Sequence, residues 1–492
     1  MSDADFIVVG SGPAGICAAL ALTEAGRTVL MLDGDADDTG GDPAAVDLGP
    51  DNGLSPKLRT PQARRLLARF VEANPITGEN FLAAGSLARG GLSRIWGGFV
   101  AEFDAADLKD WPIDHAALAP SYAKIAARIG ISGSSNDAMS AALGSNGPLQ
   151  PPLPLGAASA LLLQRHEQAG KSGGLRLGHA RNALLSQPLD GRSACDLRGA
   201  CLWGCPIGAI YDARQDLNRL RARGTFRLAD GAVVRALARE GDGWRVDVTD
   251  GRAFRAPRIL LAAGTLASSR LVASLLPPLS EWRLLSNPTL ATPLLVRGAR
   301  TAPAVPSHAL AQLAYRLDGE ELMGAVYETR NLPASGLAAQ IPLPRSAAEA
   351  LFRFLSPALL VAVTSFPGRF SRNRLSFDRT KGRLTVQGGF EPALDGAEQT
   401  ARKTLARSWR ALGAHVLPGR RRATPGTDAH FAGTLPMGGR NANGTSVLGE
   451  VAGQPGLHVV DGSVLPSLPA KHATLTIMAN ASRIAAALAR EV

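Results

Sequence analysis

The first thirty-three residues carry the feature that most constrains the fold. A short apolar run at residues 6–9 is followed by Gly10, Gly12 and Gly15 in the spacing G-x-G-x-x-G, and an apolar, alanine-rich stretch comes next. This order predicts a buried parallel strand, a tight turn and a helix whose N-terminus can receive phosphate groups. The three glycines permit the turn, a close approach to a pyrophosphate and the packing of helix on strand.

A second apolar run, residues 29–32, ends at Asp33. In dinucleotide-binding folds an acidic residue about 20 positions after the glycine turn binds a ribose hydroxyl. The sequence therefore predicts a dinucleotide site built from Gly10, Gly12, Pro13, Ala14, Gly15 and Asp33. This stretch alone does not separate FAD from NAD, because both cofactors use the same turn.

The C-terminal part of the chain adds a second set of readable features. His430 lies in "DAHFAGTLPMGG", and residues 457–460 read as a strand that ends at Asp461 and Gly462. A proline-rich loop then leads to His472 at the junction with a predicted helix, and Thr474 lies just inside that helix. The start of a helix presents free N–H groups and a positive dipole to an anionic oxygen, such as that of a reduced flavin.

Four segments in this order resemble the glucose–methanol–choline (GMC) flavin oxidoreductases. They are the first glycine turn, "ARGGLSRIWGG" at 88–98, "RILLAAGTLASSRLV" at 258–272, and the closing blocks around His430 and from Asp461 through His472 to Thr476. The resemblance covers nearly the whole chain, although roughly 281–425 match only in a general way. It implies an α/β fold with a Rossmann-like FAD-binding domain and a substrate domain that contains a mostly antiparallel sheet.

The same resemblance implies how the chain divides. The FAD-binding domain would comprise residues 1–45, 82–110, 190–280 and 425–492, and the substrate-binding domain 46–81, 111–189 and 281–424. Residues 231–240 and 243–264 alternate like a β-meander, and "RNRLSFDRTKGRLTVQGGF" at 372–390 reads as two strands around a Lys-Gly turn. A mostly antiparallel sheet in that region would roof the flavin.

Further cofactor contacts follow from the resemblance. They are Gly90, Gly91, Ser93 and Trp96 of the second segment, Val233 toward the adenine, Ala263 and Gly264, and Asp461, Gly462 and Thr474. Some members bind the flavin covalently through a histidine just before the tryptophan of the second segment. Ile95 stands there in this chain and cannot form that bond, so we expect noncovalent FAD.

His430 and His472 correspond to the pair that faces the reactive edge of the flavin in that family. Alcohol oxidation removes a hydroxyl proton while a hydride leaves the adjacent carbon for the flavin. Imidazole accepts a proton near neutral pH, and a second group can hold the hydroxyl oxygen. Two close imidazoles resist double protonation, which keeps one ready as a base. We favour His430 as that base.

The predicted function is therefore FAD-dependent oxidation of a CH–OH group in a sugar, polyol or other alcohol. The electron acceptor would be external: a quinone, a cytochrome or O2. Two alternatives keep the fold but change the class. One is a GMC-type lyase that retains FAD without net redox turnover, and the other is a noncatalytic flavin or redox-carrier subunit.

Three of the four cysteines, Cys195, Cys201 and Cys205, fall in "SACDLRGACLWGCPIG". Their spacing matches the bacterial ferredoxin run except that Arg198 replaces the second cysteine. The stretch also resembles the catalytic subunit of bacterial FAD-dependent glucose dehydrogenases, which implies a [3Fe-4S] cluster and a partner subunit. An inert reduced loop and a disulfide are the alternatives. Cys17 lies inside the first predicted helix and is expected in the core.

Composition excludes several other classes. The chain has 53 basic and 42 acidic residues, a net charge of +11, but only 5% aromatic residues and no dense basic stripe, so we expect no nucleic-acid partner. There is no apolar run of about 18 residues, hence no expected transmembrane segment. The N-terminus "MSDADFIVVG" lacks the features of a signal peptide. We therefore expect a cytoplasmic protein, exported only if a partner subunit carries it.

Overall fold

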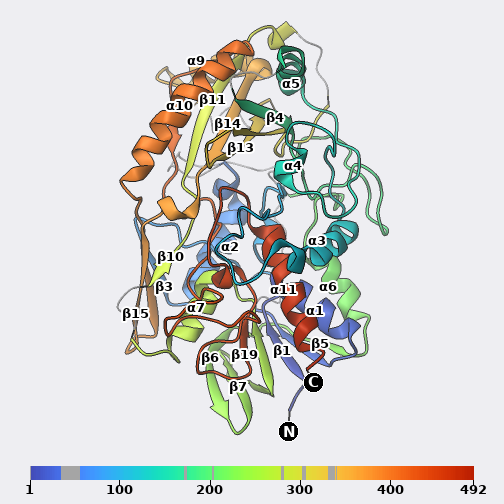
Figure 1. Ribbon diagram of the computed structural model, residues 1–492, viewed down its shortest axis with the longest axis vertical. Helices are drawn as coiled ribbons and strands as arrows, with labels where there is room; N and C mark the ends of the chain where they lie inside the picture. The colour runs from blue at the N-terminus through green and yellow to red at the C-terminus, as the bar shows by residue number, and fades with distance from the viewer. Residues whose placement is uncertain are drawn as a thin grey trace.

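The protein is described by a computed structural model (Figure 1) that covers residues 2–34, 56–170, 174–201, 204–278, 282–301, 306–330, 338 and 341–491. The predicted domain boundaries at 45–46 and 280–281 lie outside the described residues. The lower half in Figure 1 is built on one parallel sheet, and the upper half is built on one antiparallel sheet.

The parallel sheet has five strands in the order β19-β9-β1-β2-β5. The strands are β1 (Phe6–Val9), β2 (Val29–Leu32), β5 (Phe226–Ala229), β9 (Arg258–Leu261) and β19 (Leu457–Val459). β1 and β2 are buried along their whole length, as their continuous apolar runs predict for strands covered on both faces. The predicted strand–turn–helix–strand unit at the N-terminus is confirmed, with α1 at Pro13–Glu24.

Several helices pack around this sheet. α11 (Thr474–Leu488) packs against α1 and against α3 (His115–Ile129), and α6 (Arg214–Arg221) also contacts α1 (Figure 1). α7 (Thr265–Ala273) follows β9 directly, as the "AAGT" segment predicts. The predicted meander is also confirmed: β6 (Val234–Glu240), β7 (Gly243–Val248) and β8 (Ala253–Ala256) form a separate antiparallel sheet.

The antiparallel sheet of the upper half has seven strands, and it confirms the mostly antiparallel substrate sheet. Its strands are β4 (Leu175–His179), β11 (Thr289–Val296), β12 (Leu313–Leu317), β13 (Met323–Glu328), β14 (Leu359–Ser365), β17 (Ala414–Val416) and β18 (Arg421–Arg422). α5 (Ala157–Ala169) and α10 (Ala393–Ala411) bury residues in its hydrophobic core, and α9 (Arg345–Leu355) lies nearby, with α4 (Ser140–Leu143) at the edge of this half (Figure 1).

The predicted hairpin in residues 372–390 forms as β15 (Asn373–Asp378) and β16 (Arg383–Gln387). It belongs to a sheet of its own, in the order β10-β15-β16-β3, with β10 at Arg283–Leu284 and β3 at Ile76–Glu79 after α2 (Pro61–Ala73). Leu375, Leu384 and Val386 pack in the same hydrophobic core as the parallel sheet. The hairpin is therefore attached to the lower half, because its apolar face meets that core.

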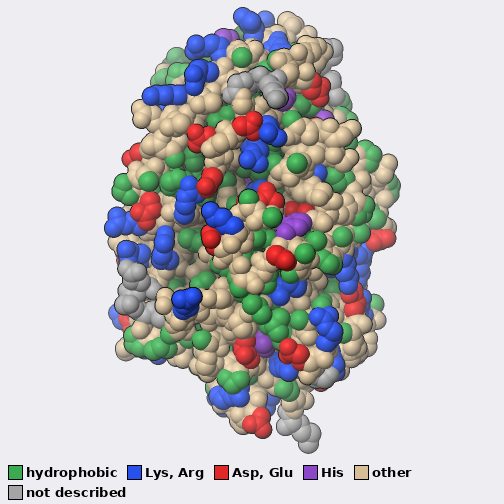
Figure 2. All heavy atoms as spheres, viewed as in Figure 1, with side chains coloured by type: hydrophobic (Ala, Val, Ile, Leu, Met, Phe, Trp, Pro, Cys, Tyr) green, Lys and Arg blue, Asp and Glu red, His purple; other side chains and the backbone are tan. Residues whose placement is uncertain are grey.

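On the face shown in Figure 2, Lys and Arg side chains are interspersed with Asp and Glu and do not form a continuous basic stripe. Within the described ranges, no helix is both long and apolar enough to cross a membrane.

Candidate active site

One cavity of about 390 Å³ lies where loops from both halves meet the carboxyl ends of the parallel strands. This edge is where open α/β sheets bind their ligands. Sixteen of the eighteen predicted site residues line it. They are Gly10, Gly12, Pro13, Ala14, Asp33, Gly91, Ser93, Trp96, Val233, Ala263, Gly264, His430, Asp461, Gly462, His472 and Thr474. Gly15 and Gly90 are not among the lining residues, and each has a different task.

The glycine turn brings two backbones together at the start of α1. Gly10 has φ +99°, and a Cβ there would lie 2.6 Å from the carbonyl oxygen of Ala262. Gly91 has φ +58°, and its Cβ would lie 3.1 Å from Cα of Gly12. A Cβ on Gly15 would lie 1.9 Å from the Gly10 carbonyl oxygen, so Gly15 serves helix–strand packing. Bare backbone at Gly12 and Gly91 leaves room for a pyrophosphate beside the helix N-terminus.

Ser11 joins Asp33, the acid predicted to bind the ribose, to the second glycine segment. The Ser11 N–H donates to Oδ2 of Asp33 at 3.1 Å, and the Gly90 N–H donates to Oγ of Ser11 at 2.9 Å. Asp33 is buried, with 3% of its surface exposed. Gly90, with φ +86°, therefore fixes the segment that carries Gly91 and Ser93. The carboxylate of Asp33 is held in place before any ligand binds.

These residues fit FAD. The cavity has a glycine-lined helix N-terminus at one end and a buried carboxylate one strand away. At the other end α11 begins at Thr474 after Ala473, without a side-chain cap and without an acidic residue in its first turn. Its first N–H groups suit an anionic oxygen of the flavin ring. Ile95, buried and lining the cavity, offers no atom for a covalent link.

His430 and His472 meet in this cavity although they come from separate loops. Their ring centroids are 4.4 Å apart, with the planes inclined at 53°. Thr265 anchors the first loop, because its Oγ1 donates to the carbonyl oxygen of Phe431 at 2.9 Å. Phe99 holds the second histidine, its ring standing edge-on to His472 at 4.8 Å. The two imidazoles therefore share one small space next to the glycine-lined cleft.

Burial sets the protonation of this pair. It lowers the pKa of His430 to about 4. It lowers the pKa of His472 well below the ordinary value, and the nearby His430 adds to that effect. Both rings are therefore neutral at pH 7, the state in which an imidazole can accept a proton.

The loop that carries His472 is fixed by a buried ion cluster. Nζ of Lys471 lies 2.8 Å from Oδ2 of Asp104 and 2.6 Å from Oδ2 of Asp107, and the lysine side chain is 6% exposed. Nearby, Nε1 of Trp111 donates to Oγ of Ser467 at 2.7 Å. The loop before α11 is thus tied to the segment that follows Phe99 at two points, both of which precede the second histidine.

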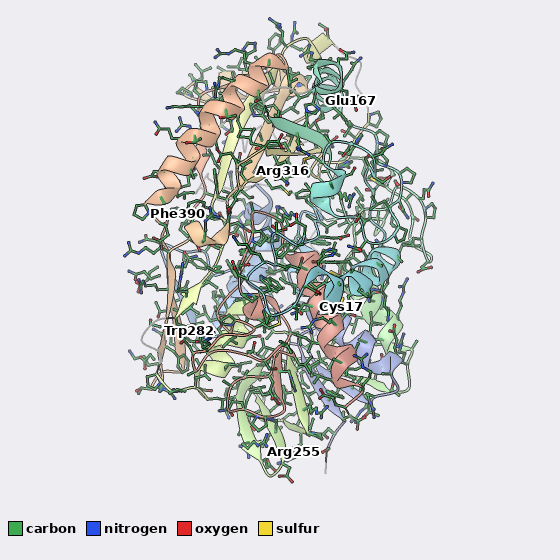
Figure 3. The ribbon with its side chains drawn as sticks, viewed as in Figure 1. Cys17, Glu167, Arg255, Trp282, Arg316 and Phe390 are labelled. Carbon is green, nitrogen blue, oxygen red and sulfur yellow. The ribbon has the colours of Figure 1, made fainter. Side chains whose placement is uncertain are left out.

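Other anchors lie farther from the cavity (Figure 3). Nε1 of Trp282, which is labelled in Figure 3, donates to the carbonyl oxygen of Thr434 at 2.7 Å, in the segment that follows His430. Cys17 is buried on α1, as expected, and its Sγ accepts from the Arg128 guanidinium of α3 at 3.0 Å. These contacts fix the layers around the cavity without entering it.

The cysteine segment folds differently from the histidine loops. Cys195, Cys201 and Cys205 are half-buried against an apolar cluster that includes Leu184, Ile210 and Leu310. Trp96 joins this cluster, and its Nε1 donates to the carbonyl oxygen of Tyr211 at 2.8 Å. No disulfide joins the cysteines of the described chain.

The sulfur atoms are also turned toward nearby backbone. Sγ of Cys195 accepts from the Leu197 N–H at 3.4 Å, and Sγ of Cys201 accepts from the Ala309 N–H at 3.3 Å. Among the residues that the structure describes, no three acidic, histidine or cysteine side chains form a group able to hold a metal ion. The described residues therefore give no support for the [3Fe-4S] cluster.

Sequence reasoning missed four residues at this site. Ser11 stands inside the first glycine turn and Phe99 directly follows the second segment, and only their neighbours were predicted as site residues. Asp428 precedes His430 by two positions, and an acid so close to a histidine is a signal that could have found it. Tyr327 lines the cavity from β13, in the part of the chain that matches the family only loosely, where no local pattern marks it.

The fold and the site together define an FAD-dependent oxidoreductase. Residues 5–44 match the family model described as FAD binding domain, and residues 389–481 match the one described as GMC oxidoreductase. These matches identify an FAD-binding domain and the C-terminal domain of GMC oxidoreductases in this chain. Both matched segments contribute residues to the cavity, the first through the glycine turn and the second through the two histidines.

Similar proteins are oxidases. Paromamine 6'-oxidase of Streptomyces fradiae is 28% identical over 543 aligned residues, which cover 99% of this chain and 92% of that protein. The 6'''-hydroxyparomomycin C oxidase of Streptomyces lividus is 32% identical over 256 residues, 48% of this chain and 42% of that protein. The crystal structure of pyridoxine 4-oxidase from Mesorbium loti has the same fold, with a TM-score of 0.62 over 99% of both chains at 16% identity.

Proposed function

We propose that this protein oxidises a CH–OH group of a sugar, a polyol or another small alcohol, with FAD as the electron acceptor inside the protein. The observation that carries the proposal is the pair of neutral imidazoles, 4.4 Å apart, at one end of the glycine-lined cavity. The oxidases of paromamine and of 6'''-hydroxyparomomycin C support a sugar-like substrate for this chain.

The chain supplies a base, a hydrogen-bonding partner and a dry environment. FAD, when bound, supplies the acceptor for a hydride. His430 takes the hydroxyl proton, and His472 holds the hydroxyl oxygen so that the carbon stays in place. Two close imidazoles resist double protonation. His430 therefore stays neutral and can accept the proton while His472 binds the oxygen. The buried ion cluster of Lys471, Asp104 and Asp107 keeps the second ring in position.

We further propose that the core around the parallel sheet marks an FAD-binding part and the core of the seven-stranded sheet a substrate-binding part. The hairpin of β15 and β16 and helix α3, which the predicted division assigns to the substrate-binding domain, pack with the first core. Tyr327 supports this division, because it reaches the cavity from the seven-stranded sheet. Burial raises its pKa to about 12, so its hydroxyl stays protonated and can donate to a substrate oxygen.

O2 is the acceptor that we propose for the electrons leaving FAD. Both relatives and the similar structure are named oxidases, and the cysteine side chains do not form a metal-holding group in the described part of the chain. Electrons would then pass from FAD to O2 without an iron–sulfur cluster or a partner subunit. A quinone or a cytochrome would be the acceptor only if O2 failed to reoxidise the protein.

A spectroscopic experiment tests the proposal. The purified protein is analysed for flavin bands, iron and acid-labile sulfide, and is then mixed anaerobically with paromamine, pyridoxine, glucose and glycerol. We expect flavin bands without iron, and bleaching of these bands by at least one alcohol. When O2 is admitted, the flavin colour should return and hydrogen peroxide should be released. Product formation without bleaching would indicate a lyase. A protein that binds FAD but neither bleaches nor turns over any alcohol would indicate a carrier subunit.

A further inference from the structure

Asp428 is a buried acid directly beside the histidine that we assign as the base. Its side chain is 3% exposed. Oδ2 accepts from the Asn287 N–H at 2.7 Å and from the His430 N–H at 3.3 Å, so its hydrogen-bond donors are backbone amides. The same Oδ2 lies 3.9 Å from Nδ1 of His430. A carboxylate has about four acceptor sites on its two oxygens, and these two bonds use only half of them, so the group can accept one bond more.

The facing nitrogen of His430 needs an acceptor. Within the described residues, Nδ1 of His430 is a buried polar atom without a hydrogen-bond partner. Hydrogen bonds require about 2.7–3.2 Å between heavy atoms, so a movement of about 1 Å would close the gap to Asp428. Hydrogen bonds at catalytic sites are often long before the substrate binds and shorten in the complex.

We propose that Asp428 is a positioning residue for the base: its carboxylate accepts a hydrogen bond from Nδ1–H of His430 and leaves the lone pair of Nε2 facing the substrate hydroxyl. The catalytic meaning of this tautomer rests on the proposed function. The hydroxyl proton moves to Nε2 and the imidazolium formed lies against the carboxylate, while FAD, when bound, would accept the hydride from the carbon. This is the role that a buried aspartate has beside a histidine base in the serine proteases.

The electrostatics of the pair support this arrangement. Burial raises the pKa of Asp428 to about 7 and lowers that of His430 to about 4, so each charge alone is disfavoured in this place. An imidazolium next to a carboxylate compensates both penalties at once. The pair can therefore hold the substrate proton although neither group favours its charged state alone.

A purely structural task for Asp428 makes a different prediction. If the side chain only accepted the two backbone N–H groups, asparagine would replace it without loss, because its carbonyl oxygen can accept the same bonds. The substitution Asp428→Asn thus separates the two roles. It keeps the size of the side chain and removes the negative charge that selects the Nδ1–H tautomer.

The first experiment needs no substrate. The FAD-loaded protein is labelled with ¹⁵N in its histidine rings, and the His430 signals are identified by their loss in His430→Gln. We expect a protonated Nδ1 and an unprotonated Nε2 for His430 at pH 8, and a loss of that preference in Asp428→Asn. A wild-type His430 protonated on Nε2, or the same tautomer in both proteins, would overturn the proposal.

The second experiment measures anaerobic flavin reduction by whichever test alcohol bleaches the wild type. For Asp428→Asn we expect a rate constant lower by about 10- to 1,000-fold, with unchanged FAD content and a nearly unchanged KM. The control Asp250→Asn removes an exposed carboxylate paired with Arg252 and should keep the wild-type rate. A wild-type rate in Asp428→Asn would contradict the proposal. If no alcohol bleaches the wild type, the proposed function fails, and the tautomer still decides the role of Asp428.

Discussion

The two histidine loops and the cysteine segment differ in how closeness in the sequence relates to closeness in the structure. His430 and His472 stand far apart in the sequence, yet their rings are 4.4 Å apart in the cavity. Cys195, Cys201 and Cys205 are close together in the sequence, yet the described side chains do not form a metal-holding group. Both regions lie near Trp96, which lines the cavity and also packs against the cysteines.

The difference teaches that a site forms where the topology brings loops together. The histidine loops flank β19 and α11 at the carboxyl edge of the parallel sheet, and anchors such as Lys471 and Thr265 hold them there. The cysteine sulfurs instead accept from backbone amides, and their side chains fill an apolar cluster. Closeness along the sequence therefore indicates a shared site less reliably than convergence at a sheet edge.

Removal of the base should have the largest effect. We expect His430→Ala to lower the rate constant of anaerobic flavin reduction by about 100- to 10,000-fold, since it removes the proton acceptor. Stopped-flow absorbance at the flavin band measures this rate. His415→Ala is the matched control, because His415 is an exposed residue of β17 and should leave the rate unchanged. A rate within twofold of the wild type in His430→Ala would exclude this residue as the base.

The pH dependence of stability gives the next effect. The pKa of Asp428 is raised to about 7, so between about pH 4 and 7 the folded state binds more protons than the unfolded state. The group therefore destabilises the protein increasingly as the pH rises through this window, by at most about 4 kcal/mol. His430, with a lowered pKa, acts in the opposite direction and is present in both proteins that are compared.

We accordingly expect Asp428→Asn to gain thermal stability relative to the wild type as the pH rises from 5 to 8. The measurement is the difference in Tm between the two proteins at several pH values, with Asp250→Asn as a control that should show no such trend. A difference that stays constant over this range would show that Asp428 titrates normally.

The anchor of the second histidine loop is the third test. In Lys471→Met, Asp104 and Asp107 lose their shared cation, and we expect a loss of about 3 kcal/mol of stability. Flavin reduction should slow as well, because the loop that places His472 loosens. Thermal unfolding and stopped-flow reduction check both effects, and Lys381→Met, which alters an exposed ion pair, should change neither. An unaffected reduction rate in a destabilised Lys471→Met protein would separate the ion cluster from the site.

A smaller effect is expected where the two glycine segments touch. Gly91→Ala forces a side chain into the left-handed region, at a cost of about 1–2 kcal/mol, and places Cβ next to Gly12. FAD affinity should fall by about tenfold, as measured by titration of the apoprotein. Gly251→Ala carries the same backbone strain without any atom within 4 Å, so it should cost stability but keep the affinity. Equal FAD affinities in the two variants would show that the pyrophosphate does not bind next to Gly91.

The cysteine segment should give the smallest effect. Replacing Cys195, Cys201 and Cys205 together by serine should leave the flavin spectrum, the iron content and the reduction rate within twofold of the wild type. Only a modest loss of stability is expected, from the apolar cluster that these side chains fill. Loss of bound iron or of electron transfer to an acceptor in this variant would show that the cysteines hold a cluster, and would contradict the comparison between the two regions.

Much of the lower half of the molecule could be predicted from the sequence. β1, β2, α1, α7 and the start of α11 lie where their patterns place them, because a glycine turn between buried strands leaves few alternative folds. The upper half was predicted only as a mostly antiparallel sheet. Tyr327 reaches the cavity through the register of β13 against β12 and β14, which is a long-range property that no local pattern contains.

The same limit applies to the smaller contacts of the site. The hydrogen bonds that join Asp33, Ser11 and Gly90 depend on the approach of two loops, and each residue alone reads as an ordinary turn residue. The ferredoxin-like spacing of the cysteines left a cluster, an inert loop and a disulfide open, and the described residues show no group that could hold a metal ion. Spacing fixes which residues can meet, but the apolar cluster around Leu184 and Ile210 decides where the side chains point.

The most direct test of the account is a crystal structure of the FAD-bound protein. We predict that the isoalloxazine ring occupies the cavity, with the imidazoles of His430 and His472 together on one face of it and within hydrogen-bonding reach of a single oxygen placed above N5. A flavin bound elsewhere, or either imidazole turned away from the ring and replaced by another side chain, would contradict the account.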